Sequence, residues 1–154
     1  MSDITAFRLV KRKWMAVAFD GEGARLYGGR WNSRGQPAIY LAGSQSLALL
    51  EVMVHLNDYR LLGSYAMFAL NIPVAAIEEL PENLVPADWR DEPAPPSTAG
   101  VGDAWLNAKS ALALVVPSVI IPQERNYLLN PNHPMFEAVV KTVSEVQFSA
   151  DPRL

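Results

Sequence analysis

The sequence predicts an α+β fold in one domain that spans residues 1–154. Strand-like and helix-like stretches are mixed, without the β–α–β rhythm that builds a doubly wound parallel sheet. The 12 prolines favour many irregular connections over long regular elements. Half of the 154 residues are hydrophobic and 19% are charged, which excludes a disordered chain and allows a sizeable core. No repeat or domain boundary is visible, and the proline-rich stretch at 88–98 is interpreted as a surface excursion.

Strands are predicted where short runs are apolar, alternating or β-branched, and helices where longer runs follow a capping residue. Ser44 is the expected N-cap of the first long helix, and Pro73 is expected to end the alternating strand that follows it. Pro117 and Ser118 separate two short buried runs. In chain order the predicted elements are a strand at 6–10, a glycine-rich loop or irregular strand at 20–35, a strand at 38–42, a helix at 45–57, a strand at 65–72, a helix at 99–110, strands at 113–116 and 119–121, a turn at 126–131 and a strand-like tail at 139–148.

Composition excludes several classes of function. The net charge of −3 argues against direct binding of nucleic acid. The absence of cysteine excludes disulfide scaffolds and thiolate metal sites, and His133 has no partner at metal-ligand spacing, so no metal is expected. No signal sequence or membrane segment is visible, so a cytoplasmic protein is expected. Seven of the 13 Lys and Arg residues lie within the first 34 positions, and this basic segment either holds a small anion or pairs with the acidic remainder.

The helix predicted after Ser44 contains the first candidate for chemistry. Its apolar residues cover every side, which is typical of a buried helix. Glu51 and His55 nevertheless lie four residues apart on one side of it. A carboxylate on such a helix is paired, neutral or directed into a cleft. The sequence leaves two interpretations open: either Glu51 pairs with His55 or lies on a partly wet edge of the helix, or it is an acid that faces a cleft.

A second candidate is the glycine-flanked segment at 28–35, which contains Arg30 and Trp31. Glycines allow close approach of a ligand, and the planar guanidinium of arginine suits phosphate or carboxylate. Trp31 adds a flat apolar surface. The alternative is a glycine-rich hairpin with Arg30 on the surface. Tyr40 by itself reads as a core aromatic residue, and Ser118 reads either as a strand irregularity or as a hydroxyl directed into a site.

Several strings in the same order resemble the RES domain family. That family is named after Arg, Glu and Ser positions, which fall here on Arg30, Glu51 and Ser118. The resemblance extends from about Phe7 to Leu154. The strings that carry it are Gly29-Arg30-Trp31-Asn32 with Gly35, Pro37 and Tyr40, then Ser46-Leu47-Ala48-Leu49-Leu50-Glu51, then Val116-Pro117-Ser118 with Asn126-Tyr127-Leu128-Leu129-Asn130-Pro131, and finally Phe148 with Asp151-Pro152-Arg153-Leu154.

The resemblance implies a bacterial toxin of a toxin–antitoxin pair with an ADP-ribosyltransferase-like mixed sheet. It implies NAD⁺ as substrate and cleavage of the nicotinamide–ribose bond by phosphate or water, with no further cofactor. The implied partner is an adjacently encoded Xre-like helix-turn-helix antitoxin that would itself carry any DNA binding. Its blocking segment is expected to bring an anionic or polar end to Arg30. A homodimer within that complex is allowed by the resemblance, and no membrane partner is expected.

The resemblance also implies roles for individual residues. Glu51 would stabilise the cationic, oxocarbenium-like transition state beside the ribose. Arg30 would bind the pyrophosphate or the ribose, and Tyr40 would stack on or orient the nicotinamide. Trp31 would be a neighbour of the nicotinamide. Ser118 and Asn126 would hydrogen-bond the nicotinamide or its ribose. His55 would tune Glu51 or contact phosphate.

Two further functions compete with NAD⁺ degradation. The same site in a protein ADP-ribosyltransferase would use NAD⁺ as donor for a protein side chain, because the acceptor is chosen by surfaces around the site. A non-catalytic interaction module would use the pocket for a partner only. Turnover of NAD⁺ by the purified protein separates this last function from the other two.

Overall fold

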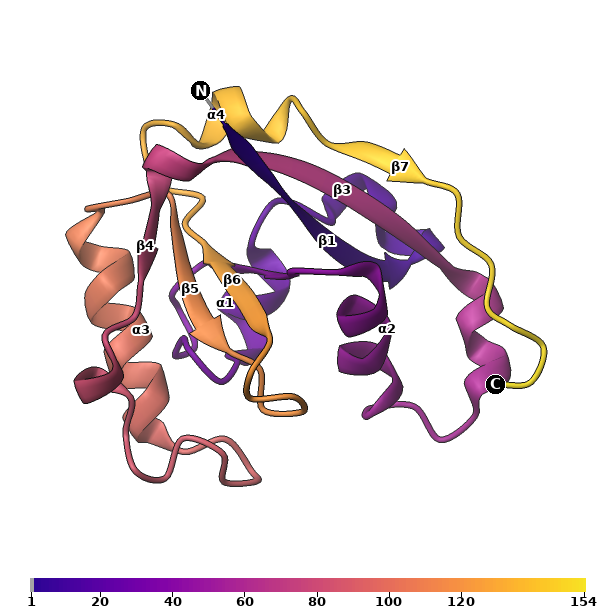
Figure 1. The fold of residues 1–154 in the computed structure, drawn as a ribbon, viewed down its shortest axis with the longest axis horizontal. Helices are drawn as coiled ribbons and strands as arrows, with labels where there is room; N and C mark the ends of the chain where they lie inside the picture. The colour runs from indigo at the N-terminus through magenta and orange to yellow at the C-terminus, as the bar shows by residue number, and fades with distance from the viewer. Residues whose placement is uncertain (1) are drawn as a thin grey trace.

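Seven strands form one mixed sheet in the computed structural model, which describes residues 2–154 (Figure 1). The strand order is β4-β5-β6-β2-β1-β3-β7, with β4 parallel to β5 and the other neighbours antiparallel. Because residues 2–154 combine this sheet with four α-helices, the predicted α+β class is confirmed. The strands are β1 Asp3–Lys11, β2 Ile39–Ala42, β3 Tyr65–Pro73, β4 Ile77–Glu79, β5 Ala113–Pro117, β6 Arg125–Leu129 and β7 Ser144–Val146.

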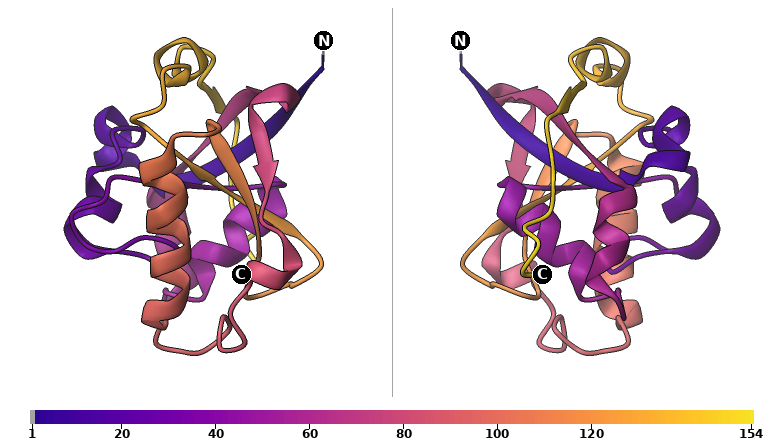
Figure 2. Two further views of the ribbon diagram at one scale, coloured as in Figure 1. Left: turned by 90° about the vertical axis from the view of Figure 1, so that its left-hand side faces the viewer. Right: turned by 90° about the vertical axis from the view of Figure 1, so that its right-hand side faces the viewer.

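The two longer helices, α2 and α3, pack on the same face of the sheet, α2 on the β1–β3 part and α3 on β5 and β6, whereas α4 packs on the opposite face. Figure 2 shows α3 facing the viewer in its left-hand view and the C-terminal tail facing the viewer in its right-hand view. In Figure 1, β5 and β6 lie between α3 and α2. The helices are α1 Glu22–Tyr27, α2 Gln45–Met53, α3 Pro96–Ala108 and α4 Phe136–Val140.

The first three predicted strands and both longer helices are confirmed, with shifted ends. Ser44 caps α2 as expected, because its hydroxyl accepts a hydrogen bond from the N–H of Leu47 at 3.0 Å. The helix ends at Met53, four residues before the predicted end. α3 begins three residues earlier than predicted, because Pro96 fits the first turn of a helix, where no N–H is required.

Four local predictions were wrong. The glycine-rich stretch contains α1, since Gly21 and Gly28 adopt positive φ just outside the helix rather than interrupting it. Residues 126–129, predicted as a turn, belong to β6, because pairing with β2 and β5 on both sides overrides the turn propensity. The predicted strand at 119–121 is a bend, and the tail is helical at 139–140 and extended at 144–146.

The helix α2 is half-buried, although its composition predicts burial on every side. Leu47 and Ala48 are the residues of α2 that are fully buried, against the inner side of β1 and β2. Val54, just after the helix, is exposed. Because the opposite side of α2 borders a cleft rather than a second layer, its remaining apolar side chains are only partly covered.

Strands β1 and β2 pair at one register position and then separate. Phe7 lies opposite Ala42, whereas β1 pairs with β3 along its whole length and β2 pairs with β6 along all four of its residues. The sheet is therefore divided into a β1–β3–β7 part and a β4–β5–β6–β2 part that meet at this position. The opening between the two parts positions the functional site.

Helix α3 packs closely on the loop that precedes β2. Trp105 and Leu106 of α3 share a buried cluster with Trp31 and with apolar residues of β5 and β6. At Gly102 the helix backbone contacts the backbone of Trp31 so closely that an added Cβ would overlap the Trp31 carbonyl. Gly102 is therefore required for the distance between α3 and the loop.

Substituting Gly102→Ala is expected to lower the free energy of unfolding by about 3 kcal/mol, because backbone atoms cannot yield as a flexible side chain would. Gly100→Ala in the same helix is the control, since nothing lies within 4 Å of its added Cβ. That change is expected to stabilise the protein by about 0.5–1 kcal/mol. Urea denaturation of the two variants measures both effects, and equal stability of the two would contradict the close contact.

Candidate active site

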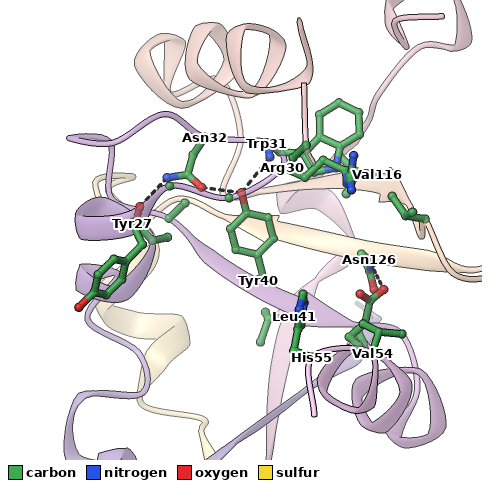
Figure 3. A pocket seen from close by; sticks show the side chains of 18 of the residues that line it. Tyr27, Arg30, Trp31, Asn32, Tyr40, Leu41, Val54, His55, Val116 and Asn126 are labelled. Carbon is green, nitrogen blue, oxygen red and sulfur yellow. Dashed lines mark hydrogen bonds between the residues drawn. The ribbon is translucent and has the colours of Figure 1, made fainter. Parts of the chain in front are cut away.

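A cleft of about 1240 Å³ opens where β1 and β2 separate (Figure 3). Its walls come from β1, the loop before β2, β2 itself, α2, the ends of β5 and β6, and the segment at 92–96. Six of the seven site residues predicted from the sequence line it, namely Arg30, Trp31, Tyr40, Glu51, His55 and Asn126.

Glu51 is held at one of its two carboxylate oxygens. The hydroxyl of Ser118 donates to Oε1 at 3.0 Å, and Nδ2 of Asn126 donates to the same oxygen at 2.7 Å. Oε2 makes no hydrogen bond with the described part of the chain. No ion pair joins Glu51 to His55 among residues 2–154, and Glu51 lines the cleft. The carboxylate is fixed in orientation and keeps one oxygen for a ligand.

Ser118 lies behind Glu51 rather than in the cleft. Its side chain is 0% exposed, and its oxygen also accepts hydrogen bonds from the N–H groups of Ile120 and Ile121, both at 3.1 Å. These bonds form the bend that follows β5. The predicted contact of Ser118 with nicotinamide or ribose is therefore not available in this arrangement. Ser118 is a positioning residue for Glu51.

Asn126 lies on β6 opposite Ala42, and it faces the cleft beside Glu51. Its Nδ2 is used by Glu51, while its Oδ1 is buried without a hydrogen-bond partner in the described residues. An unpaired buried oxygen is costly and uncommon in native structures.

Tyr40 organises the loop that carries Arg30. Its hydroxyl donates to Oδ1 of Asn32 at 2.5 Å and accepts from the N–H of Trp31 at 3.0 Å (Figure 3). Burial raises the pKa of the Tyr40 hydroxyl far above its ordinary value, so the group remains neutral and is no general base at physiological pH. Its ring still lines the cleft, as expected for a residue that orients a planar ligand.

Asn32 was not singled out from the sequence as a functional residue. It is buried, and its Nδ2 donates to the carbonyls of Ala24, Ser33 and Gln36. Its amide therefore ties α1 to the loop before β2 and to the hydroxyl of Tyr40. In the sequence, Asn32 stands out only as the last residue of the Gly29-Arg30-Trp31-Asn32 string. Its role in holding the loop depends on hydrogen bonds to Ala24 and Tyr40, each eight positions away.

Trp31 is a core residue in this structure. It is 2% exposed and packs in the cluster beneath α3, so its ring offers little surface to NAD⁺. The exposed aromatic ring of the cleft is that of Tyr27, at 77% exposure, which Figure 3 shows at the end opposite Asn126. His55 is also exposed at the cleft, and its imidazole makes no hydrogen bond with the described residues.

Arg30 is engaged by its own chain. Its Nη1 donates to the carbonyls of Trp89 and Asp91 at 2.9 and 2.8 Å, and its Nη2 pairs with the carboxylate of Glu92. The Arg30 side chain is 13% exposed, whereas that of Glu92 is 72% exposed. Arg30 thus fixes the proline-rich segment as a wall of the cleft, and its contact with NAD⁺ stays a prediction.

No cluster of three or more metal-ligating side chains and no helix able to cross a membrane occur within residues 2–154. The overall fold resembles that of a chain of known structure. The crystal structure of the M. tuberculosis MbcT–MbcA toxin–antitoxin complex contains a chain that matches with a TM-score of 0.71 and 21% identity, covering 95% of this chain and 82% of that one.

The family model for the RES domain matches residues 5–151, and the chain belongs to the RES domain family. A protein named Toxin Res from Yersinia enterocolitica is 43% identical over 96% of this chain and 97% of its own length. Another Toxin Res, from Photorhabdus laumondii, is 40% identical over 96% and 95%. A protein named Prs ADP-ribosylating toxin from Sphingobium sp. is 35% identical over 93% and 90%.

Substituting Tyr40→Phe is expected to lower the free energy of unfolding by about 2 kcal/mol, because it leaves Oδ1 of Asn32 and the N–H of Trp31 without their partner. Tyr27→Phe is the matched control, since its exposed hydroxyl makes no hydrogen bond in the described structure. Its stability should stay within about 0.5 kcal/mol of the parent. Thermal unfolding compares the two, and a Tyr40→Phe protein as stable as Tyr27→Phe would contradict the organising role.

Proposed function

We propose that this protein is the toxin of a toxin–antitoxin pair and that it cleaves the nicotinamide–ribose bond of NAD⁺. The observation that carries the proposal is the Glu51 carboxylate, held through Oε1 by Ser118 and Asn126 with Oε2 left for a ligand. The family membership and the names of the relatives support the same conclusion.

The reaction needs stabilisation of positive charge. Departure of nicotinamide leaves an oxocarbenium-like ribosyl cation, and a fixed carboxylate beside it lowers the barrier without forming a covalent bond. Because Oε1 is already bound, the carboxylate does not have to reorient during the reaction. Oε2 is then available to the ribose hydroxyls and the developing cation.

Two forms of this function differ in the group that accepts the ADP-ribosyl moiety. Attack by water or inorganic phosphate degrades NAD⁺ and needs no protein surface. Transfer to a protein side chain would make this chain an ADP-ribosyltransferase, and the relative named Prs ADP-ribosylating toxin favours this second candidate. Incubation with NAD⁺, with and without phosphate, followed by mass spectrometry of small molecules and of added protein, separates the two forms.

Glu51→Gln is expected to reduce NAD⁺ turnover at least about 100-fold while leaving the fold intact, because the amide keeps the shape but lacks the charge. Ser118→Ala should cause a smaller loss of about tenfold, since Glu51 keeps its bond to Asn126. Release of nicotinamide, followed by chromatography, measures both.

Glu82→Gln is the control for removing one carboxylate, since Glu82 is exposed and lies outside the cleft. It should turn over NAD⁺ at the parent rate. A folded Glu51→Gln protein that keeps parental turnover would contradict the role of Glu51, and no turnover by the parent protein would favour a non-catalytic interaction module.

The proposed partner is an antitoxin of the Xre-like helix-turn-helix type that enters the cleft and excludes NAD⁺. A solved structural relative was crystallised as a toxin–antitoxin complex, which supports a partner of this kind. An anionic end of the partner would have to compete with Glu92 for Arg30. Co-purification with the adjacently encoded protein should yield a complex that turns over NAD⁺ at least about tenfold more slowly than the free chain. A complex with the rate of the free chain would place neutralisation outside the cleft.

A further inference from the structure

Arg30 is paired with an acid of its own chain at the edge of the cleft. Glu92 belongs to the proline-rich segment that forms one wall, 62 positions after Arg30. Its Oε1 accepts a hydrogen bond from Nη2 of Arg30. An anion of the protein therefore already lies on the guanidinium that is predicted to contact NAD⁺. Glu92 has no part in the reaction proposed above, so its place beside Arg30 needs another explanation.

The position of Arg30 does not depend on Glu92. The Nη1 of Arg30 donates to the backbone carbonyls of Trp89 and Asp91 at 2.9 and 2.8 Å, and these two bonds fix the guanidinium. Within residues 2–154, Nη2 is bound by Glu92 alone and Nε has no hydrogen-bond partner. Nε and Nη2 form one edge of the guanidinium, and such an edge suits two oxygens of a phosphate or carboxylate. Glu92 occupies this edge through a single oxygen.

Glu92 is held much less firmly than Arg30. The side chain of Glu92 is 72% exposed, whereas that of Arg30 is 13% exposed. The bond to Arg30 is the one hydrogen bond that the Glu92 carboxylate makes with the described residues. An ion pair that water can reach contributes little to stability, because water competes for the charges and the side chains must be ordered. An anion that offers two oxygens can therefore displace Glu92 and leave the wall in place.

We propose that Glu92 is an internal competitor for Arg30, an autoinhibitory contact that phosphoryl oxygens of the substrate must displace. Its carboxylate holds Nη2 before a ligand binds and moves into solvent afterwards, while the two carbonyls keep Arg30 in place. Glu92 thereby lowers the affinity of the cleft for anions and raises the substrate concentration at which the site fills. This inference rests on the proposed function, because NAD⁺ or inorganic phosphate would supply the phosphoryl oxygens.

The first experiment measures anion binding without turnover. Pyrophosphate is titrated into the parent protein and into Glu92→Gln by calorimetry at constant ionic strength. Affinity is expected to rise at least about threefold in Glu92→Gln, because the neutral amide keeps the size of the side chain but no longer competes as a charge. Glu82→Gln is the control, since Glu82 is also exposed but lies outside the cleft, and its affinity should stay within about twofold of the parent. Equal or lower affinity in Glu92→Gln, or no binding by either protein, would overturn the inference.

A second arginine of the cleft makes a further control necessary. Arg8 also lines the cleft, where it donates to the carbonyls of Ala18 and Tyr40 at 2.9 Å each. Removing a nearby acid would strengthen the attraction of an anion to any such cation through long-range charge. The Glu92→Gln change is therefore repeated in an Arg30→Gln background, where it should leave the affinity for pyrophosphate within about 1.5-fold. A rise as large as in the parent background would show a general charge effect and overturn the inference.

A chemical measurement covers the case in which Arg30→Gln does not fold. Phenylglyoxal modifies accessible arginines, and mass spectrometry locates the modified sites. Arg30 is expected to react faster in Glu92→Gln than in the parent, because the carboxylate no longer covers Nη2, and pyrophosphate should slow that reaction. Arg12, which pairs with Glu145 outside the cleft, should react alike in both proteins. Unchanged reactivity of Arg30 in Glu92→Gln, or no protection by pyrophosphate, would overturn the inference.

The source of the phosphoryl oxygens is resolved by kinetics. A lower KM for NAD⁺ in Glu92→Gln assigns the displacement of Glu92 to the dinucleotide. A lower KM for phosphate alone assigns it to the acceptor. An unchanged or higher KM for both, with or without a change in kcat, would make Glu92 a structural residue of the wall and overturn the inference.

The binding measurements also separate this inference from the proposed function. If Glu92→Gln binds pyrophosphate more tightly than the parent but neither protein releases nicotinamide from NAD⁺, the autoinhibitory contact stands and the proposed reaction fails. If NAD⁺ is cleaved but Glu92→Gln changes neither the affinity for pyrophosphate nor any KM, the proposed reaction stands and the role of Glu92 fails.

Discussion

The separation of β1 from β2 after one shared register position creates the cleft on which every candidate residue depends. A continuous ladder between these strands would close the sheet, and backbone hydrogen bonds would fill the space now open to a ligand. Phe7 and Ala42 keep the two parts of the sheet together, while β1 continues along β3 and β2 along β6. Helix α2 packs across this junction by Leu47 and Ala48, and so brings Glu51 to the edge of the opening.

Three charged groups of the cleft are stabilised in three different ways. Glu51 receives two hydrogen bonds on one oxygen, which fixes its orientation and leaves the other oxygen to a ligand. Arg30 pairs with Glu92 and two carbonyls, and so becomes part of a wall. Arg8 is held by two neutral carbonyls and retains its charge without a paired acid.

Several residues act through their neighbours. Ser118 holds Glu51 from behind, and Tyr40 and Asn32 hold the loop that carries Arg30. The order of motifs predicted that these residues belong to one site, but their individual roles did not follow from it. A hydroxyl next to Pro117 looks the same in the sequence whether it faces a ligand or a carboxylate. The difference depends on the bend after β5, where Ser118 also accepts two backbone N–H groups.

The sequence by itself determined the α+β class, the first three strands and the two longer helices, because these depend on local periodicity and capping. Through its resemblance to the RES domain family, it also predicted that Arg30, Tyr40, Glu51, His55 and Asn126 belong to one site. The remaining features depend on contacts between segments that are distant in the sequence, and only the tertiary structure shows them. Pairing on both sides made a strand of the turn-like residues 126–129, and the packing of α3 at Gly102 buried Trp31. The pairing of Arg30 with Glu92, 62 residues away, and the unpaired Arg8 likewise depend on contacts between distant segments, which no local pattern encodes.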